Sequence, residues 1–533
     1  MRFLLRVLIC ATACWGQTAP SIEGRVVNAI TGEPVGKVSL TLRAEGRSDA
    51  HSATSTADGK FRIEAVEPGQ YTLMAVRAGF LPQAYGARSR NLWQGSMLTV
   101  AEGVRIKDIE FKLTPQSAVS GKVVDEDGDP MPDVQVTLLQ TGYTAGKRQM
   151  TRTGGDSTND LGEFRIPNVS AGRYFLHAEP QGGNGIFGAI HSSVKPESDR
   201  EETYVGAYYP GSSDLSAAAP IEVRSGQQVS GMNIPLRKSA VYHVRGKVAG
   251  AYMNTRVMML SRSPGSYEAG YGDMLKADKT FDIAGVRPGE YLLVASAVDG
   301  RQRTVARLPV TVGNRDLNDL TIALIPNAEI RGASRIIGTD GSVKPLDTDL
   351  RVALMSADPT TSPTSVTTLN EDGTFSFRNV GADRYRVSAQ SSNSQLYLKS
   401  VKLGDQEVLE SGIDWPQGAS GTLQVTMSNA AGEVDGVVRN EKGEAVPGAM
   451  VVLVPEIPQP DIAFLYKIAN ADQNGQFSIK ALAPGDYRVM APGDIDPGEE
   501  FDPGFIKKYG DKSVKVKVEE NSRLRIQVAV GSL

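Results

Sequence analysis

The sequence predicts an all-β protein of five tandem, seven-stranded antiparallel β-sandwiches that follow a cleaved signal peptide. Three observations carry this prediction: a strand-forming block that occurs five times, turn signals at short intervals, and the lack of a long stretch with helical periodicity. The 533 residues include 56 glycines and 29 prolines, which suits a chain with many turns. A hydrophobic content of 40% is enough for folded cores.

The N-terminal residues 1–19 have the pattern of a secretory signal peptide. Basic residues Arg2 and Arg6 precede or interrupt an apolar stretch that ends in small residues. The stretch is too short for a membrane-spanning helix. Cleavage would remove both cysteines, Cys10 and Cys14. Two alternatives stay open: a buried first strand, and a lipid anchor on Cys14, whose preceding residues weakly resemble a lipoprotein processing site.

The repeated block begins with a phenylalanine, has a tyrosine ten residues later, and ends with an alanine four residues after the tyrosine. Its copies occupy residues 61–75, 164–178, 281–295, 375–389 and 477–491. Successive tyrosines are 94 to 117 residues apart, the size of one small domain. Chance does not produce this spacing five times, so the chain is predicted to repeat one module.

Each part of the block predicts a local structure. In the first copy Phe61 and Ile63 alternate with polar residues, so both face one side of a strand. Pro68-Gly69 predicts a turn, because proline presets φ and glycine accepts a positive φ. Tyr71 then begins the next strand. A tyrosine in this position can bury its ring and return its hydroxyl to the backbone, as in the tyrosine corner of β-sandwiches.

The copies also share an opening and a close. Four of them open with Gly-x-Val, and the fourth copy has Gly332-Ala-Ser instead, so it is the divergent one. The predicted sandwiches span residues 20–116, 117–239, 240–327, 328–430 and 431–533. The second sandwich carries a long insertion, residues 181–219. A short helix is predicted only within residues 503–509.

Together these motifs resemble the carboxypeptidase regulatory-like domain, a transthyretin-like (prealbumin-like) and thus immunoglobulin-like β-sandwich. The resemblance covers nearly all of the chain after the signal, and it is most specific in the first, second and fifth copies. Related folds are grouped with carbohydrate-binding modules, and tandem arrays of this kind are similar to those of exported bacterial proteins. The resemblance implies the fold firmly and the ligand only faintly, because such sandwiches have many functions.

The residues that catalysis would need are not found in a recognisable pattern. Lys and Arg number 57 against 61 Asp and Glu, a net charge of −4, which argues against binding to nucleic acid. None of the four histidines has the glutamate three positions later that a zinc carboxypeptidase needs. His177 alternates outward on a strand and is expected to be an ordinary surface side chain. The chain is therefore predicted not to be an enzyme.

One acidic loop is a candidate metal site. Asp125, Asp127 and Asp129 offer carboxylates two residues apart around Gly128, a pattern that suits calcium. The alternative, a solvated turn, is favoured because the first and fifth copies repeat the position without repeating the acids. No other cofactor is expected.

Aromatic residues in loops are the candidate ligand-binding residues. They are Trp93, Tyr204, Tyr208, Tyr209 and Trp415, from loops of the first, second and fourth copies. Flat rings in loops suit the binding of sugars. The favoured alternative is that these rings pack between neighbouring sandwiches.

The function expected from the sequence is that of a non-enzymatic binding or scaffolding array. It would be secreted, periplasmic or on the cell surface, with no membrane span. Its expected partner is an envelope or extracellular protein, bound through sandwich loops and edges. The alternative is a polysaccharide bound by the aromatic loops.

Overall fold

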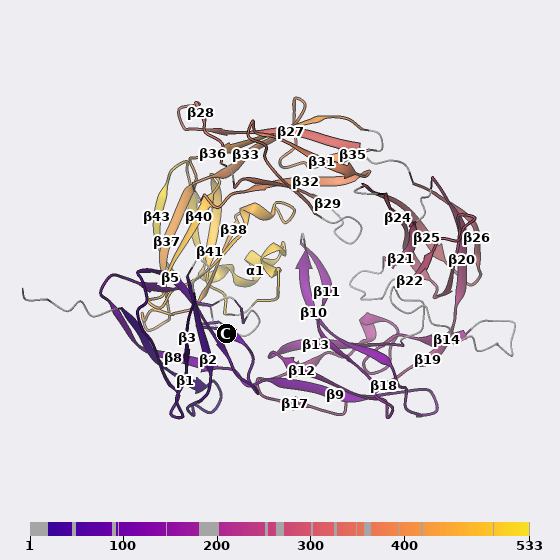
Figure 1. Ribbon diagram of the computed structural model, residues 1–533, viewed down its shortest axis with the longest axis horizontal. Helices are drawn as coiled ribbons and strands as arrows, with labels where there is room; N and C mark the ends of the chain where they lie inside the picture. Colours follow the sequence, from indigo (N-terminus) through magenta and orange to yellow (C-terminus); the bar gives the residue numbers. More distant parts are fainter. Residues whose placement is uncertain are drawn as a thin grey trace, which may run out of the picture. The chain divides into compact units, whose positions relative to one another are not determined.

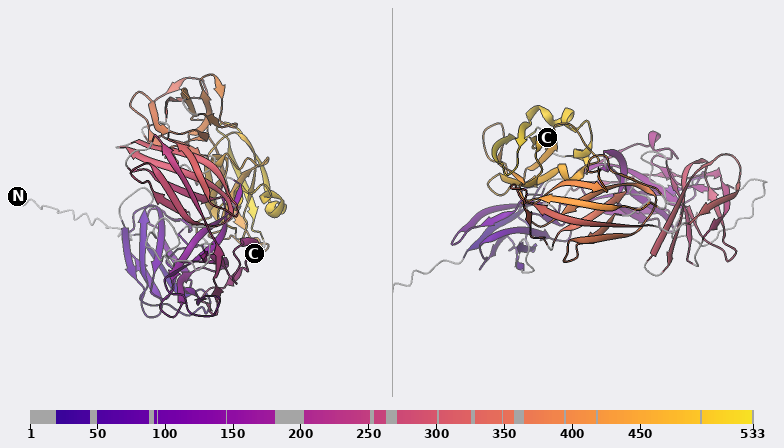
Figure 2. Two further views of the ribbon diagram at one scale, coloured as in Figure 1. Left: turned by 90° about the vertical axis from the view of Figure 1, so that its right-hand side faces the viewer. Right: turned by 90° about the horizontal axis from the view of Figure 1, so that it is seen from above.

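The computed structural model of the chain is built almost entirely of β-strands (Figures 1 and 2). It describes residues 20–44, 50–87, 92–93, 95–144, 146–180, 202–250, 254–262, 271–299, 302–324, 328–347, 349–356, 364–393, 395–416, 419–493 and 495–531. The predicted signal segment, with Cys14, and half of the predicted insertion lie outside these residues. The all-β prediction is confirmed.

The first sandwich is a compact unit by itself. Its strands are β1 (Ser21–Asn28), β2 (Ser39–Ala44), β3 (Ala50–Thr54), β4 (Lys60–Ile63), β5 (Gly69–Val76), β6 (Gln83–Ala84), β7 (Leu98–Val100) and β8 (Arg105–Leu113). One sheet has the order β4-β1-β8; the other has the order β3-β2-β5-β6, with β7 also paired to β5. Phe61, Ile63, Tyr71 and Leu73 of the repeated block all lie in the core between the sheets.

The second and third sandwiches belong to the other compact unit. The second has β9 (Ser117–Val124), β10 (Val134–Thr144), β11 (Lys147–Ser157), β12 (Glu163–Val169), β13 (Gly172–Pro180), β14 (Glu202–Val205), β15 (Ala207–Tyr208), β16 (Ile221–Val223), β17 (Gln228–Val229) and β18 (Ile234–Pro235), and β19 (Arg237–Ala240) pairs with β14. The third has β20 (Tyr242–Ala249), β21 (Arg256–Ser261), β22 (Tyr271–Met274), β23 (Thr280–Val286), β24 (Gly289–Asp299), β25 (Gln302–Val312) and β26 (Leu317–Ala323).

The fourth and fifth sandwiches complete this unit. The fourth has β27 (Ala328–Ile337), β28 (Val343–Lys344), β29 (Arg351–Ser356), β30 (Ser365–Thr368), β31 (Thr374–Val380), β32 (Asp383–Gln390), β33 (Tyr397–Leu403), β34 (Gln406–Glu407), β35 (Ile413–Trp415) and β36 (Thr422–Ser428). The fifth has β37 (Gly432–Arg439), β38 (Met450–Pro455), β39 (Lys467–Asn470), β40 (Gln476–Leu482), β41 (Gly485–Met490), α1 (Phe505–Tyr509), β42 (Val514–Val518) and β43 (Arg523–Ala529). The helix α1 lies within the segment where the sequence predicts it (Figure 1).

The sheets differ from the prediction in two respects. The opening and closing strands of each sandwich pair in parallel, for example β1 with β8 and β37 with β43, so the sheets are not wholly antiparallel. Seven strands occur in the third and fifth sandwiches, whereas short additional strands raise the number in the other three within the described residues. Each sandwich has its own apolar core, which confirms five tandem sandwiches, and a sixth, smaller apolar cluster packs Phe505 of α1 against β38 and β41 of the fifth sandwich. The exact boundaries between the sandwiches remain predictions.

All five block tyrosines form the predicted corner. Each hydroxyl donates to the backbone carbonyl four residues earlier: Tyr71 to Glu67 at 2.8 Å, Tyr174 to Ser170 at 3.0 Å, Tyr291 to Arg287 at 3.0 Å, Tyr385 to Gly381 at 3.0 Å and Tyr487 to Ala483 at 2.9 Å. The bond satisfies a buried hydroxyl and ties the turn to the strand that follows. The repeated tyrosine is therefore explained by the fold.

The glycine of the opening Gly-x-Val motif is explained by close packing in the sheet that contains the opening and closing strands. A Cβ on Gly246 would lie 2.4 Å from the carbonyl oxygen of Leu320 and 2.7 Å from the ring of Phe281. The divergent fourth copy keeps this arrangement, since a Cβ on Gly332 would lie 2.3 Å from the ring of Phe375. Glycine is required where the block phenylalanine and the closing strand approach the backbone of the opening strand.

Candidate functional site

The predicted calcium residues form a capped turn. Asp125 Oδ1 accepts backbone N–H bonds from Asp127 at 3.0 Å and from Asp129 at 2.9 Å. Its Oδ2 accepts a bond of 3.4 Å from the hydroxyl of Tyr204. Asp127 and Asp129 are exposed on the turn. The Asp125 carboxylate is thus oriented toward its own backbone, as in an Asx turn.

The other copies show why this position is polar. In the fifth sandwich, Asn440 Oδ1 accepts N–H bonds of 3.0 Å from both Lys442 and Glu444. The amide oxygen of Asn440 therefore accepts the same two backbone bonds as the Asp125 carboxylate. What the copies share at this position is a side-chain oxygen that caps the turn. Within the described ranges, no group of three or more His, Cys, Asp or Glu side chains is arranged to hold a metal ion.

Two of the predicted ligand-binding aromatics are buried. Tyr208 is 1% exposed in β15, which pairs with β13. Trp415 is 2% exposed in β35, where it packs into the core of the fourth sandwich. Both residues belong to short strands that the sequence analysis assigned to loops. Their burial leaves no ring face for a sugar, which corrects the prediction for these two residues.

The remaining three predicted aromatics differ in exposure. Tyr209 is half-buried against the core of the second sandwich. Tyr204 is also half-buried, and the ammonium of Lys238 lies 5.1 Å from the centre of its ring. Trp93 is 68% exposed. Of the five, only Trp93 presents most of its ring to solvent.

His177 contradicts the expectation of a surface side chain. It does lie on the outer face of β13, but it is 2% exposed, and its ring centre is 4.6 Å from that of Tyr208. The backbone at Gly206, from the end of the insertion, covers it: a Cβ there would lie 3.0 Å from His177 Nε2. Burial and the positive charge of Arg287 lower the pKa of His177 from 6.5 to about 3. The imidazole is therefore neutral at physiological pH.

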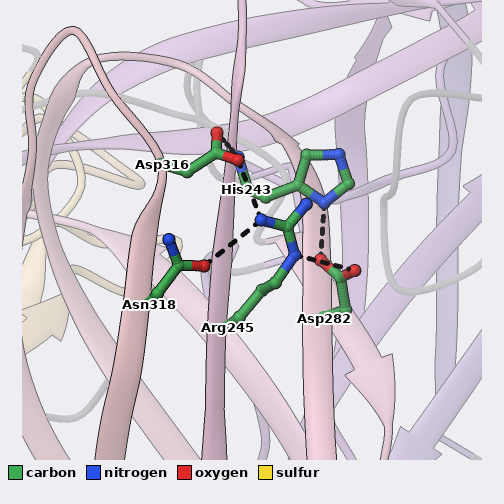
Figure 3. A network of polar contacts seen from close by, with 5 residues as sticks. All are labelled: His243, Arg245, Asp282, Asp316 and Asn318. Atoms are coloured by element: carbon green, nitrogen blue, oxygen red, sulfur yellow. Dashed lines mark hydrogen bonds and ion pairs between the residues drawn. The ribbon is translucent and has the colours of Figure 1, made fainter.

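A polar cluster lies on the outer face of the sheet that β20, β23 and β26 form in the third sandwich (Figure 3). Arg245 donates to Asp282 at 3.1 Å, to Asp316 at 2.8 Å and to Asn318 at 3.2 Å. His243 Nδ1 lies 2.5 Å from Asp282 Oδ1. Although partial burial opposes it, the bonds from His243 and Arg245 lower the pKa of Asp282.

The same outer face carries charge ladders in other copies. In the fifth sandwich, Glu433 lies 3.5 Å from Lys480 and 3.7 Å from Arg523 on the neighbouring strands. In the first, Arg62 lies 3.5 Å from Glu23. Opposite charges on adjacent strands stabilise sheets modestly. We therefore interpret the cluster of Figure 3 as a cross-strand ladder that stabilises the sheet.

A groove of about 520 Å³ lies between the fourth and fifth sandwiches, and the sequence analysis did not predict it. The fourth sandwich contributes residues 397–399 at the start of β33 and residues 409–410. The fifth contributes residues from the segment 455–465, residues 483–487 and Glu520. The volume is in the range of ligand-binding clefts.

Polar contacts hold the two walls of this groove together. Glu520 accepts bonds from the hydroxyl of Tyr397 at 3.0 Å and from the ammonium of Lys399 at 2.9 Å. These two bonds lower the pKa of the Glu520 carboxyl. Arg386 of the fourth sandwich pairs with Asp461 of the fifth at 3.2 Å. Phe464 of the fifth packs against the apolar core of the fourth.

The surface of the groove is apolar with an acidic edge. Its apolar lining includes Leu398, Leu409, Pro455, Ile457, Ile462, Phe464, Leu465 and Pro484. Ile457 is 74% exposed, although it is a large aliphatic side chain. Its neighbours Pro455, Pro458 and Pro460 are the sequence signal that could have indicated an unusual loop here. An exposed aliphatic residue on a concave apolar surface is typical of a binding site.

The four carboxylates of the groove fall into two classes. Glu456 accepts two bonds from Arg488, at 2.7 and 3.0 Å, and Glu520 is paired with Lys399. The Arg488 bonds lower the pKa of Glu456. Glu410 and Asp486 form no ion pair with any side chain in the described part of the chain. They stand on opposite walls, one from each sandwich.

Residues 21–113 and 118–185 match the model of the carboxypeptidase regulatory-like domain family. The predicted resemblance is therefore confirmed for the first and second copies. No curated protein matches the sequence. Within the described residues, no helix has the length and apolar character needed to cross a membrane.

Several solved structures share local similarity with the chain. A streptococcal ancillary pilin is 10% identical, with 58% of this chain and 99% of that chain covered and a TM-score of 0.19. A minor pilin of Streptococcus agalactiae is 15% identical, with 42% and 97% covered and a TM-score of 0.23. Two B repeat units of the collagen-binding protein of Staphylococcus aureus are 12% identical, with 77% and 100% covered and a TM-score of 0.14. Likeness at these values says nothing about what this chain binds.

Proposed function

We propose that the chain is an exported, non-enzymatic binding protein of the cell envelope or exterior, and that it holds a partner protein in the groove between its fourth and fifth sandwiches. The observation that carries this proposal is the exposed Ile457 on the apolar surface of that groove. The residues that the copies share have structural roles in the sandwiches, as the corner tyrosines show. The groove, by contrast, belongs to one junction, where differences between copies can serve a specific partner.

Export is proposed from the N-terminal residues 1–19. These residues lie outside the described part of the chain, so cleavage near residue 19 and lipid attachment at Cys14 both stay predictions. Labelling of cells with a radioactive fatty acid separates them: a labelled chain that loses its label in a Cys14→Ala variant indicates a lipid anchor.

Photochemical cross-linking in cells tests the binding proposal. A photoreactive amino acid at position 457 is expected to give a discrete adduct with another protein. Position 343 is the matched control, because Val343 is 72% exposed, also aliphatic, and outside the groove. An adduct from 457 and none from 343 supports the proposal. Equal patterns from the two positions would contradict it.

Carbohydrate binding is the second candidate, favoured by the exposure of Trp93. An exposed indole is a surface on which a sugar ring can pack. A glycan array probed with the wild type and with a Trp93→Ala variant tests it. Signal that is lost in the variant supports carbohydrate binding, and no signal for the wild type contradicts it.

A further inference from the structure

We propose that the segment held in the groove is a short, extended stretch of the partner protein that carries both aliphatic and basic side chains. This inference rests on the function proposed above and names the class of the ligand. It follows from three properties of the groove: the kind of apolar side chain that lines it, the charges that remain unpaired, and the strand edge that lies in it.

The apolar lining favours aliphatic groups over sugars. Aliphatic residues and prolines make up most of it, including the exposed Ile457. The two tyrosines of the groove offer no flat ring, since Tyr397 is 6% exposed and Tyr487 is 2% exposed. The third aromatic residue of the lining, Phe464, is half-buried and packs against the core of the fourth sandwich. A sugar would need such a ring to stack on, whereas aliphatic side chains need only the area that burial removes from water.

The unpaired charges favour a cation. Glu410 and Asp486 face the groove from its two walls, and each lies on an exposed stretch. The cations of the region already have partners, because Lys399 binds Glu520, and Arg488 and Lys515 bind Glu456. Lys517, which lies opposite Asp486 on β42, pairs with Glu519 at 3.7 Å. The groove therefore keeps an excess of negative charge, which attracts lysine or arginine and repels acidic ligands.

The edge of β33 favours an extended backbone. In its sheet β33 lies between β36 and β34, but β34 pairs only with Lys402 and Leu403. At residues 397–399, which line the groove, one edge of β33 has no strand partner in the described ranges. Tyr397 and Leu398 are only 6% and 3% exposed, so this edge is open to a ligand only at the exposed Lys399. An extended peptide can add main-chain hydrogen bonds there while its side chains meet the apolar walls.

Fluorescence anisotropy with the full chain and labelled peptides tests this inference. The probe is a short peptide in which leucine and lysine alternate. Two further peptides replace lysine by glutamate or leucine by serine. The leucine–lysine peptide is expected to bind most tightly, and high salt is expected to weaken its binding because the charged groups are exposed. Equal binding of the leucine–glutamate peptide would overturn the inference.

Variants of the chain locate the binding to the groove. Glu410→Gln combined with Asp486→Asn is expected to weaken the leucine–lysine peptide about two- to tenfold, as expected for two exposed charge pairs. Glu371→Gln combined with Asp405→Asn removes the same charge from exposed turns outside the groove and is expected to leave affinity unchanged. Ile457→Ser is expected to cost about tenfold through lost apolar contact. Unchanged affinity in both groove variants would overturn the inference.

The outcomes separate the ligand class from the function. A protein adduct from position 457 without binding of any leucine–lysine peptide would overturn the ligand class and leave the proposed function intact. An adduct between two copies of this chain would also overturn it, because the occupant would then be a second copy. If position 457 gave no protein adduct at all, the proposed function would be contradicted.

Discussion

At the scale of single residues, His177 shows that the burial of a side chain can be predicted wrongly although its strand is predicted correctly. The alternation of β13 places its side chain on the outer face of the sheet, and the structure agrees. The sequence does not show that the end of the insertion, with Gly206 and Tyr208, covers that face. Burial by a distant segment is a tertiary effect, so local periodicity cannot reveal it.

Burial of His177 predicts a stability that depends on pH. The pKa of His177 is about 3 in the folded chain against 6.5 for an unperturbed group, so between these values the unfolded chain binds more protons. Stability is then full above pH 6.5 and falls as the pH drops, by up to about 1.4 kcal/mol per pH unit.

Urea unfolding at several pH values measures how the free energy of unfolding depends on pH, and hydrogen exchange in β13 provides the local readout. A His177→Phe variant keeps a ring against Tyr208 but has no group to protonate, and is expected to show a smaller slope between pH 4 and 6. Identical slopes in the variant and the wild type would show that His177 is not the source.

At the scale of elements, the sequence predicted the repeated parts well. The corner tyrosines and the short helix α1 occur where their residues indicate. These features depend on neighbours in sequence. The glycine of the Pro-Gly pair does not adopt the predicted positive φ: Gly69 already begins β5, and the positive φ of this connection belongs to Ala65. The parallel pairing of opening and closing strands was not predicted, because strand direction depends on how often the chain crosses between the sheets. Likewise, β15 and β35 are too short to be recognised by alternation, which is why Tyr208 and Trp415 were assigned to loops.

The opening glycine gives a prediction at this scale. Gly246→Ala places a methyl group against the Leu320 carbonyl oxygen and the Phe281 ring, so the first sheet of sandwich three must shift. The free energy of unfolding is expected to fall by about 1–3 kcal/mol, the usual cost of overpacking.

Gly313→Ala in the same sandwich is the matched control. No atom lies within 4 Å of a Cβ at Gly313, so this variant is expected to unfold like the wild type. Thermal unfolding of both variants, with hydrogen exchange in β20 as the local readout, provides the comparison. Equal loss of stability in the two variants would contradict the packing explanation.

At the scale of the whole molecule, the proposed function depends on what the repeats do not share. The residues common to the five copies fill cores, cap turns and space strands. The groove forms where residues of two consecutive sandwiches meet, more than a hundred residues apart in sequence at Tyr397 and Glu520. Such a junction leaves little trace in sequence beyond the prolines near Ile457, so the site could not be predicted from the repeat itself.

The most direct test of the account is photochemical cross-linking from position 457 in two backgrounds. The account predicts a protein adduct in the otherwise unchanged chain and a clearly lower yield when Glu410→Gln and Asp486→Asn are both present. An adduct of undiminished yield in the doubly substituted chain would contradict the account, because the unpaired carboxylates of the groove would then have no part in binding.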